Sequence, residues 1–207
     1  MSAEAALHPG GDTRRRIVEM AERLFREMGY RKTTVADIAR ALRMSPANVY
    51  RFFASKSAIN EAVAERLTAE VQARLEAVAR GQGPAASRMR DLLLTLNRCV
   101  RELGGADLKM QEMVEAAMNE SWNVIRAHID RVDAIVAGLL REGAAAGEFA
   151  VADPDGTAAC IRAAMLRFCH PQLLAQCEAV PRPTVEQQVD FIMAALGARP
   201  ADAGRFC

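Results

Sequence analysis

Apolar residues recur at helical spacing along most of this chain, and no segment alternates as a β-strand would. Clusters of Gly and Pro separate the apolar stripes. Beyond the first 56 residues the pattern predicts four helices. The first covers about 57–79, the second ends at about 103, the third covers about 107–118, and a long fourth follows and runs through Leu139. The segment 143–152 is predicted as a loop.

Helix start and stop signals predict two further helices in the C-terminal half of the chain. Asp153 and Pro154 form a cap and first residue, and this helix is predicted to end at His170, because the residue before Pro171 resists the helical conformation. Thr184 caps a last helix. We therefore expect an all-α protein of about nine helices.

The N-terminal pattern predicts three shorter helices. A single apolar stripe marks the first, over 14–28. Its members are Ile17, Ala21, Leu24, Phe25 and Met28. Arg14, Arg15 and Arg16 stand at its predicted start, where the helix dipole disfavours positive charge. Contact with phosphate would explain this cluster, and a solvated basic face is the alternative.

Two capped helices with a tight turn follow, over Thr33–Lys56. Thr34 caps the first of them, with Asp37 three residues on. Ser45 caps the second and Pro46 occupies its first position. So short a turn requires the two helices to cross steeply, which is the geometry of a helix-turn-helix.

The second of these helices presents a polar face. At about 100° per residue, Val49 and Phe53 point inward. The outward residues are Ala47, Asn48, Tyr50 and Arg51. Asn and Arg side chains can read the edges of adenine and guanine. A polar face is often only solvated, but caps and turn occurring together favour a helix that enters the major groove of DNA.

Residues 33–59 resemble the DNA-binding signature of the tetracycline-repressor (TetR) family of bacterial transcriptional regulators. The resemblance rests on Thr33-Thr34, Asp37-Ile38-Ala39 and the stretch Ser45-Pro46-Ala47-Asn48-Val49-Tyr50-Arg51-Phe52-Phe53-Ala54-Ser55-Lys56-Ser57. It implies that Thr34, Tyr50 and Lys56 contact phosphates and that residues 45–51 read bases. Thr33 and Arg14 are further candidates for the DNA-binding set.

Three positions depart from the family pattern. Ala47 replaces the usual glycine, and Phe52 replaces a histidine and cannot donate a hydrogen bond to phosphate. Ser57 replaces an acidic residue and is expected to cap the next helix.

The charge balance changes along the chain. Residues 1–60 carry 11 basic and 6 acidic residues, a net of +5, whereas the rest carries 16 and 20, a net of −4. A basic head suits attraction to DNA. We expect a flexible arm over 1–12, a DNA-binding domain over 13–56, an effector-binding and dimerisation domain over 57–196, and a flexible tail over 197–207.

The last two helices predict a homodimer. Both carry apolar residues on more than one side, and a helix that is apolar on two sides needs two partners. The residues expected at the interface are Ile161, Met165, Val185, Val189, Ile192 and Leu196. A two-fold dimer predicts a palindromic operator in double-stranded DNA, with recognition helices about 34 to 36 Å apart.

The family resemblance implies a pocket for a small apolar or amphipathic effector among the middle helices. The candidate lining is Met113, Met118, Trp122, Arg126, Met165 and Phe168. Met residues at helical spacing also suit a plain core, so that reading stays open.

Other functions have less support. The chain shows no phosphate loop, dinucleotide fingerprint, HExxH motif or nucleophile elbow, so we expect no catalytic residue, no metal and no cofactor. Five cysteines without a CxxC pair argue against a zinc site or a disulfide framework, and thiol-based redox sensing through Cys169 or Cys177 remains the alternative. With no secretory signal and no run of ~18 apolar residues, the cytoplasm is expected, without membrane contact.

Overall fold

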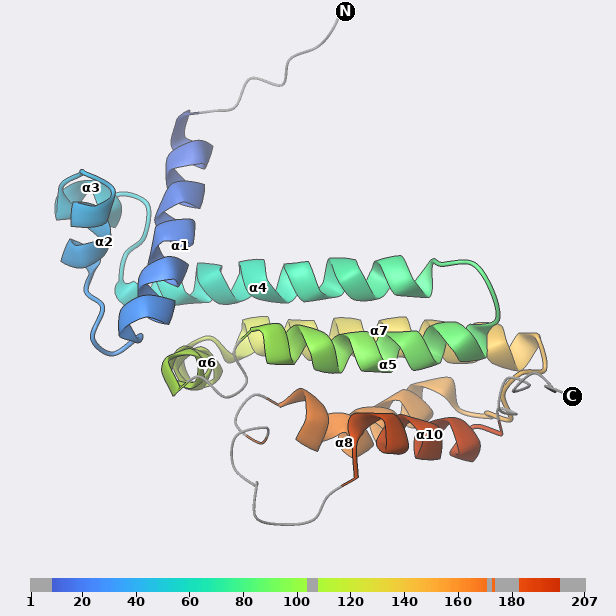
Figure 1. The fold of residues 1–207 in the computed structure, drawn as a ribbon. Helices are drawn as coiled ribbons and strands as arrows, with labels where there is room; N and C mark the ends of the chain where they lie inside the picture. Colours follow the sequence, from blue (N-terminus) through green and yellow to red (C-terminus); the bar gives the residue numbers. More distant parts are fainter. Residues whose placement is uncertain (1–8, 104–107, 171–172, 174–182, 198–207) are drawn as a thin grey trace, which may run out of the picture. The chain divides into compact units, whose positions relative to one another are not determined.

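The computed structural model describes residues 9–103, 108–170, 173 and 183–197, and over these the chain is all-α (Figure 1). Its helices are α1 (Pro9–Met28), α2 (Val35–Ala41), α3 (Pro46–Tyr50), α4 (Lys56–Ala79), α5 (Ala85–Glu102), α6 (Leu108–Glu120), α7 (Trp122–Ala145), α8 (Pro154–Cys169) and α10 (Val185–Ala195). The predicted fold class is confirmed. The predicted N-terminal arm, up to residue 8, and the predicted tail, from residue 198, lie outside the described residues.

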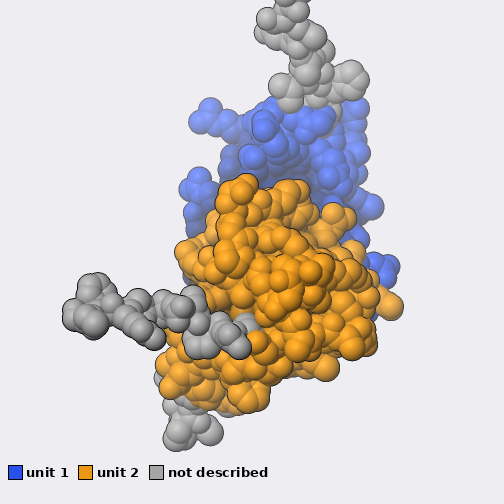
Figure 2. Space-filling model, turned by 90° about the vertical axis from the view of Figure 1, so that its right-hand side faces the viewer, with its two compact units in different colours: residues 1–67, 107–125 blue, residues 68–106, 126–207 orange. Residues whose placement is uncertain are grey.

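The chain forms two compact units, which Figure 2 distinguishes by colour. Unit 1 comprises residues 1–67 and 107–125, and unit 2 comprises residues 68–106 and 126–207. Helix α4 runs from one unit into the other, and α6 belongs to unit 1 although residues 68–106 of unit 2 separate the two segments in sequence. The predicted boundary after residue 56 groups α6 with the effector domain, whereas its packing groups it with the DNA-binding helices.

A small apolar core holds unit 1 together. Its fully buried side chains include Ile17, Ala21, Phe25, Ile38, Ala39, Val49, Ile59 and Val63. Helix α1 packs on both α2 and α6, and α2 packs on α3. The predicted stripe on α1 is largely inside, but Met28 is 39% exposed.

Helix α1 begins five residues before its predicted start. Asp12 therefore occupies the first turn, where negative charge suits the dipole, and its carboxylate accepts from Arg15 at 2.8 Å. Arg14 to Arg16 lie beyond that turn. The predicted conflict between these arginines and the helix dipole is consequently small.

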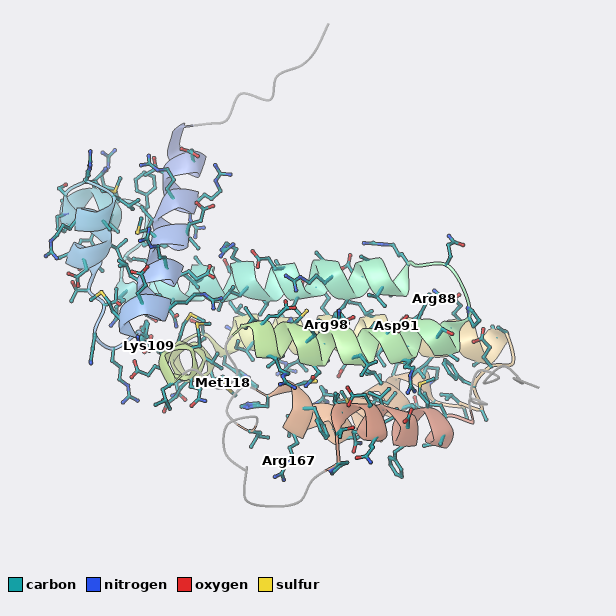
Figure 3. All side chains as sticks on the ribbon, viewed as in Figure 1. Arg88, Asp91, Arg98, Lys109, Met118 and Arg167 are labelled. Atoms are coloured by element: carbon teal, nitrogen blue, oxygen red, sulfur yellow. The ribbon has the colours of Figure 1, made fainter. Side chains whose placement is uncertain are left out.

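In unit 2, α5, α8 and α10 pack against one another (Figure 1). Two acidic residues hold the N-terminal end of α5. Pro84 at the cap has no side-chain donor or acceptor to offer, and the Glu148 carboxylate accepts from the amides of Ala85 and Ala86 at 3.1 and 2.8 Å. The Arg88 guanidinium (Figure 3) pairs with Glu142 and keeps the pKa of that carboxyl below its usual range.

Candidate nucleic-acid interface

Helix α3 projects its polar face to solvent as predicted. Ser45 Oγ accepts from the amide of Asn48 at 3.2 Å, and Pro46 stands at the start of the helix. The residues exposed along it are Ser45, Pro46, Ala47, Tyr50 and Arg51, with Asn48 half-buried. Val49 is fully buried, and this anchors the helix to the rest of unit 1.

Thr34 both caps α2 and remains exposed. Its hydroxyl donates to Asp37 Oδ2 at 2.6 Å and accepts from the Asp37 amide at 3.2 Å, while its own amide donates to the same carboxylate at 3.0 Å. These bonds to Thr34 lower the pKa of Asp37. An exposed hydroxyl at the electropositive start of a helix is suitably placed for a phosphate oxygen.

Thr33 lies inside unit 1 and is not available to DNA. Its side chain is fully buried, and its hydroxyl donates to the carbonyl oxygen of Gly29 at 2.8 Å. The residue therefore fastens the segment that joins α1 to α2. Of the two adjacent threonines predicted to contact DNA, only Thr34 is exposed.

Lys56 has internal partners that the sequence did not predict. Its ammonium donates to the carbonyl oxygens of Tyr30 and Thr33, at 3.0 and 3.2 Å, and lies 4.3 Å from the centre of the Tyr30 ring. Ser55 rather than Ser57 caps the helix that Lys56 begins, with its Oγ 3.0 Å from the Ala58 amide. The lysine thus ties the start of α4 to the α1–α2 linker.

Replacing Lys56 with methionine is therefore expected to lower the free energy of unfolding by about 2 kcal/mol, since hydrogen bonds to a charged donor contribute about 1.5 to 3 kcal/mol. Denaturant unfolding of the two proteins measures this. Lys32→Met, at an exposed site in the same linker, is the control and should leave stability unchanged. If Lys56→Met is as stable as the wild type but binds DNA poorly, the lysine acts on phosphate rather than on the fold.

Arg14 lies against an aromatic ring. Its guanidinium carbon is 4.5 Å from the centre of the Phe53 ring, and Phe53 is buried at the end of the helix-turn-helix. The arginine itself is exposed, so its remaining donors face solvent. This cation–π contact orients the guanidinium without occupying its N–H donors.

The candidate effector residues divide between the two units. Met113 is buried in unit 1, Met118 (Figure 3) is half-buried, and Trp122 is 48% exposed. In unit 2, Met165 and Phe168 belong to the apolar core, and the backbone carbonyl of Phe168 accepts from Asn97. The exposed Arg126 lies 3.9 Å from Asp130.

Two cavities are described, and both lie in unit 1. One is lined by residues of α1 and the α2–α3 turn, and the other by residues of α1 and α4. Neither cavity is lined by a residue that was predicted to bind the effector. The lining of an effector pocket stays a prediction.

The residues predicted for the dimer interface face the interior of their own subunit. Ile161, Met165, Val189, Ile192 and Leu196 are all at most 5% exposed and belong to the core of unit 2, with Val185 packed beside them. The large apolar residues that these helices expose are Leu166 on α8, at 48%, and Phe191 on α10, at 68%. The residues predicted to meet a second copy thus pack within the subunit, and the location of the dimer interface stays a prediction.

The thiols described in the structure do not favour redox sensing. Burial raises the pKa of Cys169 to about 12, so this thiol stays protonated and unreactive at neutral pH. Cys99 is buried and Cys160 is exposed. Cys177, the other predicted sensor, lies outside the described residues.

Among the described residues, no helix is long and apolar enough to cross a membrane. Over the same part of the chain, no group of three His, Cys, Asp or Glu side chains is placed to hold a metal ion.

A three-helix head with a capped, outward-facing recognition helix defines a helix-turn-helix DNA-binding protein. The family model described as bacterial regulatory proteins, tetR family, matches residues 17–63, and that of the tetracyclin repressor-like C-terminal domain matches residues 85–193. The chain belongs to the TetR family of DNA-binding transcriptional regulators, which are not enzymes. A search of curated proteins found no match.

Solved structures show the same fold. A TetR/AcrR-family regulator from Thermobifida fusca is 25% identical with a TM-score of 0.61, over 89% of this chain and 96% of its own. A TetR-family regulator from Mesorhizobium loti is 20% identical with a TM-score of 0.68, over 92% and 97%. SmeT, the repressor of the Stenotrophomonas maltophilia multidrug efflux pump SmeDEF, is 23% identical with a TM-score of 0.65, over 91% and 92%.

Proposed function

We propose that this protein is a ligand-responsive transcriptional repressor that binds a palindromic operator as a homodimer in the bacterial cytoplasm and is released by a small apolar or amphipathic effector. The observation that carries the proposal is the exposed face of α3, held by the Ser45 cap and the buried Val49. Phosphate contacts position such a helix, and base contacts give it sequence preference.

Within this face, Arg51 and Asn48 are the proposed base readers, and Thr34 and Tyr50 the proposed phosphate contacts. Arg51 is exposed and has no acidic partner among the described residues, so its planar guanidinium is free to donate two bonds to a guanine edge. Tyr50 is 52% exposed and is the last residue of α3, directly before Arg51.

Arg51→Ala is expected to relax base preference at one position of each half-site and to weaken specific binding about 10-fold to 100-fold, since a bidentate pair discriminates by about 1 to 3 kcal/mol. Selection of binding sites from a random duplex library, followed by titration, measures both effects. Tyr50→Phe is the comparison, because loss of a phosphate contact should weaken binding to all sequences equally. A uniform loss for Arg51→Ala would reassign it to phosphate.

We propose Leu166 and Phe191 as the apolar centre of the dimer interface. An exposed Phe on a helix whose other side is buried has no partner within the described part of its own subunit. A second copy related by a two-fold axis would cover the same residues on both chains. The closed four-helix arrangement of α8 and α10 then holds the two heads at a fixed separation.

Helix α6 is the proposed route by which an effector reaches the DNA-binding head. Tyr30 Oη donates to Glu120 at 3.1 Å, the amide of Arg31 to Glu112 at 3.2 Å, and the Arg31 guanidinium to Glu115 at 3.2 Å. Three carboxylates of one helix thus hold the short segment between α1 and α2.

This segment leads directly to the recognition helices. Tyr30 lies under the Lys56 ammonium and edge-on to Phe25, with ring centres 5.2 Å apart. Burial, together with the bond to Glu120, raises the pKa of Tyr30 to about 12, so it donates throughout the physiological range. A ligand that displaces α6 would move the linker that positions α2.

Such a switch needs differential affinity. Moving the dimer from about 99% to about 1% DNA-competent requires roughly 5.5 kcal/mol of ligand preference for the released form. An effector that binds both forms equally would leave the operator occupied.

A further inference from the structure

Arg43 adopts a backbone conformation that an arginine normally avoids. Its φ is 55°, the only positive φ among the non-glycine residues that the structure describes. In this left-handed region a Cβ crowds its own backbone, so glycine is favoured there. The turn enforces the conformation, because the Arg43 amide donates to the Arg40 carbonyl at 3.1 Å and the Met44 amide to that of Ala39 at 3.0 Å. Glycine would fit this turn better than arginine does.

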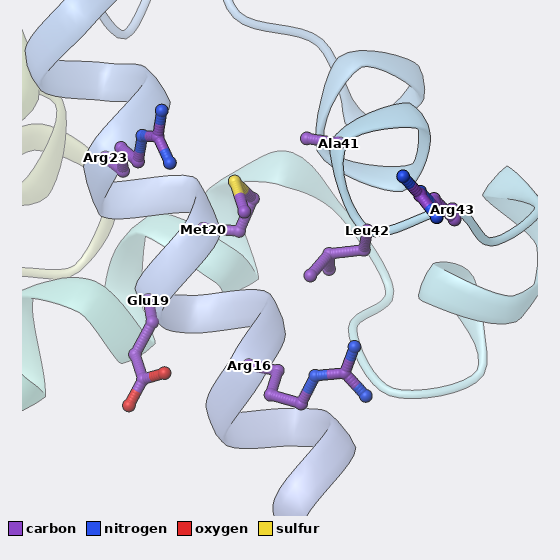
Figure 4. A pocket seen from close by; sticks show the side chains of 7 residues that line it. All are labelled: Arg16, Glu19, Met20, Arg23, Ala41, Leu42 and Arg43. Carbon is purple, nitrogen blue, oxygen red and sulfur yellow. The ribbon is translucent and has the colours of Figure 1, made fainter.

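The Arg43 side chain borders a groove on the head. The groove has a volume of about 490 Å³ and lies between α1 and the α2–α3 turn. Its lining is Arg16, Glu19, Met20, Arg23, Ala41, Leu42 and Arg43. Figure 4 shows Arg16 and Arg43 on either side of Leu42, with the Glu19 carboxylate directed away from both.

The charges around this groove are only partly balanced. Arg23 pairs with Glu27 at 2.8 Å, whereas Arg16 and Arg43 are exposed and have no acidic partner among the residues that the structure describes. Glu19 lies 3.9 Å from Arg15. Two unpaired guanidinium groups at one groove favour an anion between them, since Arg binds phosphate through planar, paired donors.

We propose that Arg16 and Arg43 together grip one backbone phosphate of the DNA, in the groove between α1 and the α2–α3 turn. Arg43 stands two residues before the Ser45 cap, so a phosphate held there fixes how the N-terminal end of α3 enters the major groove. The unfavourable backbone conformation is retained because the side chain that it carries binds DNA. This inference rests on the proposed function and adds two specific contacts to it, Arg43 in the α2–α3 turn and Arg16 on α1.

Replacing Arg43 with glycine separates its effect on the stability of the turn from its effect on DNA binding. The variant is expected to unfold at a higher temperature than the wild type, because glycine suits the turn, and yet to bind DNA about 3-fold to 10-fold more weakly at about 0.1 M salt. The slope of log affinity against log salt should become shallower by about 0.9, as for one lost phosphate contact. The probe is a duplex of about 30 base pairs, used both with random sequence and with a sequence obtained by selection.

Arg16→Ala should produce the same change in slope, and the double variant should lose little more than either single one, because both side chains hold one phosphate. Arg23→Ala is the control: it removes a cation from the same groove, but one already paired with Glu27, and should leave the slope unchanged. An unchanged slope in Arg43→Gly or in Arg16→Ala, or fully additive losses, would overturn the shared contact. Failure of the wild type to prefer the selected duplex would instead overturn the proposed function.

Discussion

Replacing Phe191 with arginine is expected to leave the protein monomeric and to weaken its binding to a palindromic operator about 1000-fold. Phe191 is 68% exposed on α10, so the subunit does not need it for its own core. At a two-fold interface each substitution is present twice. If each copy removes about 2 kcal/mol, the dimer loses about 4 kcal/mol, which corresponds to about three orders of magnitude in dissociation constant.

Sedimentation at micromolar concentration measures the oligomeric state, and titration of a duplex carrying two half-sites measures affinity. Leu166→Arg should act in the same direction with a smaller effect, because Leu166 exposes less of its surface. Ala145→Arg, at an exposed position on α7, adds the same charge elsewhere and should leave the dimer intact. A Phe191→Arg protein that still sediments as a dimer would show that the interface lies on other residues.

Replacing Gly143 with alanine is expected to lower the free energy of unfolding by about 3 kcal/mol. A Cβ at this position of α7 would lie 2.2 and 2.4 Å from two atoms of the Phe149 ring and 3.1 Å from Ala85 Cβ. Phe149 is only 6% exposed, so its ring has no free space into which to turn. Insertion of one methyl into so close a contact costs about 1 to 3 kcal/mol, and the backbone must also shift.

Thermal unfolding would show this as a midpoint lower by roughly 6 to 12 °C for a chain of this size. Gly138→Ala is a matched control in the same helix: a Cβ there meets nothing within 4 Å, and alanine should stabilise the helix by about 1 kcal/mol. Equal stability of Gly143→Ala and the wild type would mean that the Phe149 ring moves without loss of packing.

Features that depend on a few neighbouring residues followed directly from the sequence. Thr34 and Ser45 cap α2 and α3 as predicted, because each cap bonds an amide only three residues away. The outward direction of Tyr50 and Arg51 follows from helical spacing once Val49 is placed inside. These short-range rules established the helix-turn-helix and, with the family signature, its class.

Features that depend on distant residues required the tertiary structure. Spacing shows that a helix has two apolar sides, but only packing reveals that Val189 and Ile192 face the subunit's own core while Phe191 faces outward. The internal bonds of Lys56 and the burial of Thr33 arise because the linker between α1 and α2 folds over them.

The position of α6 is another feature that depends on distant residues. The sequence of residues 108–120 does not predict that their carboxylates bind Tyr30 and Arg31, which lie more than 80 residues earlier. The sequence by itself therefore determined what kind of partner the head recognises, since that information is local. Which faces are left for a second subunit and which helix touches the head were decided by packing, because burial depends on side chains that meet only in the folded chain.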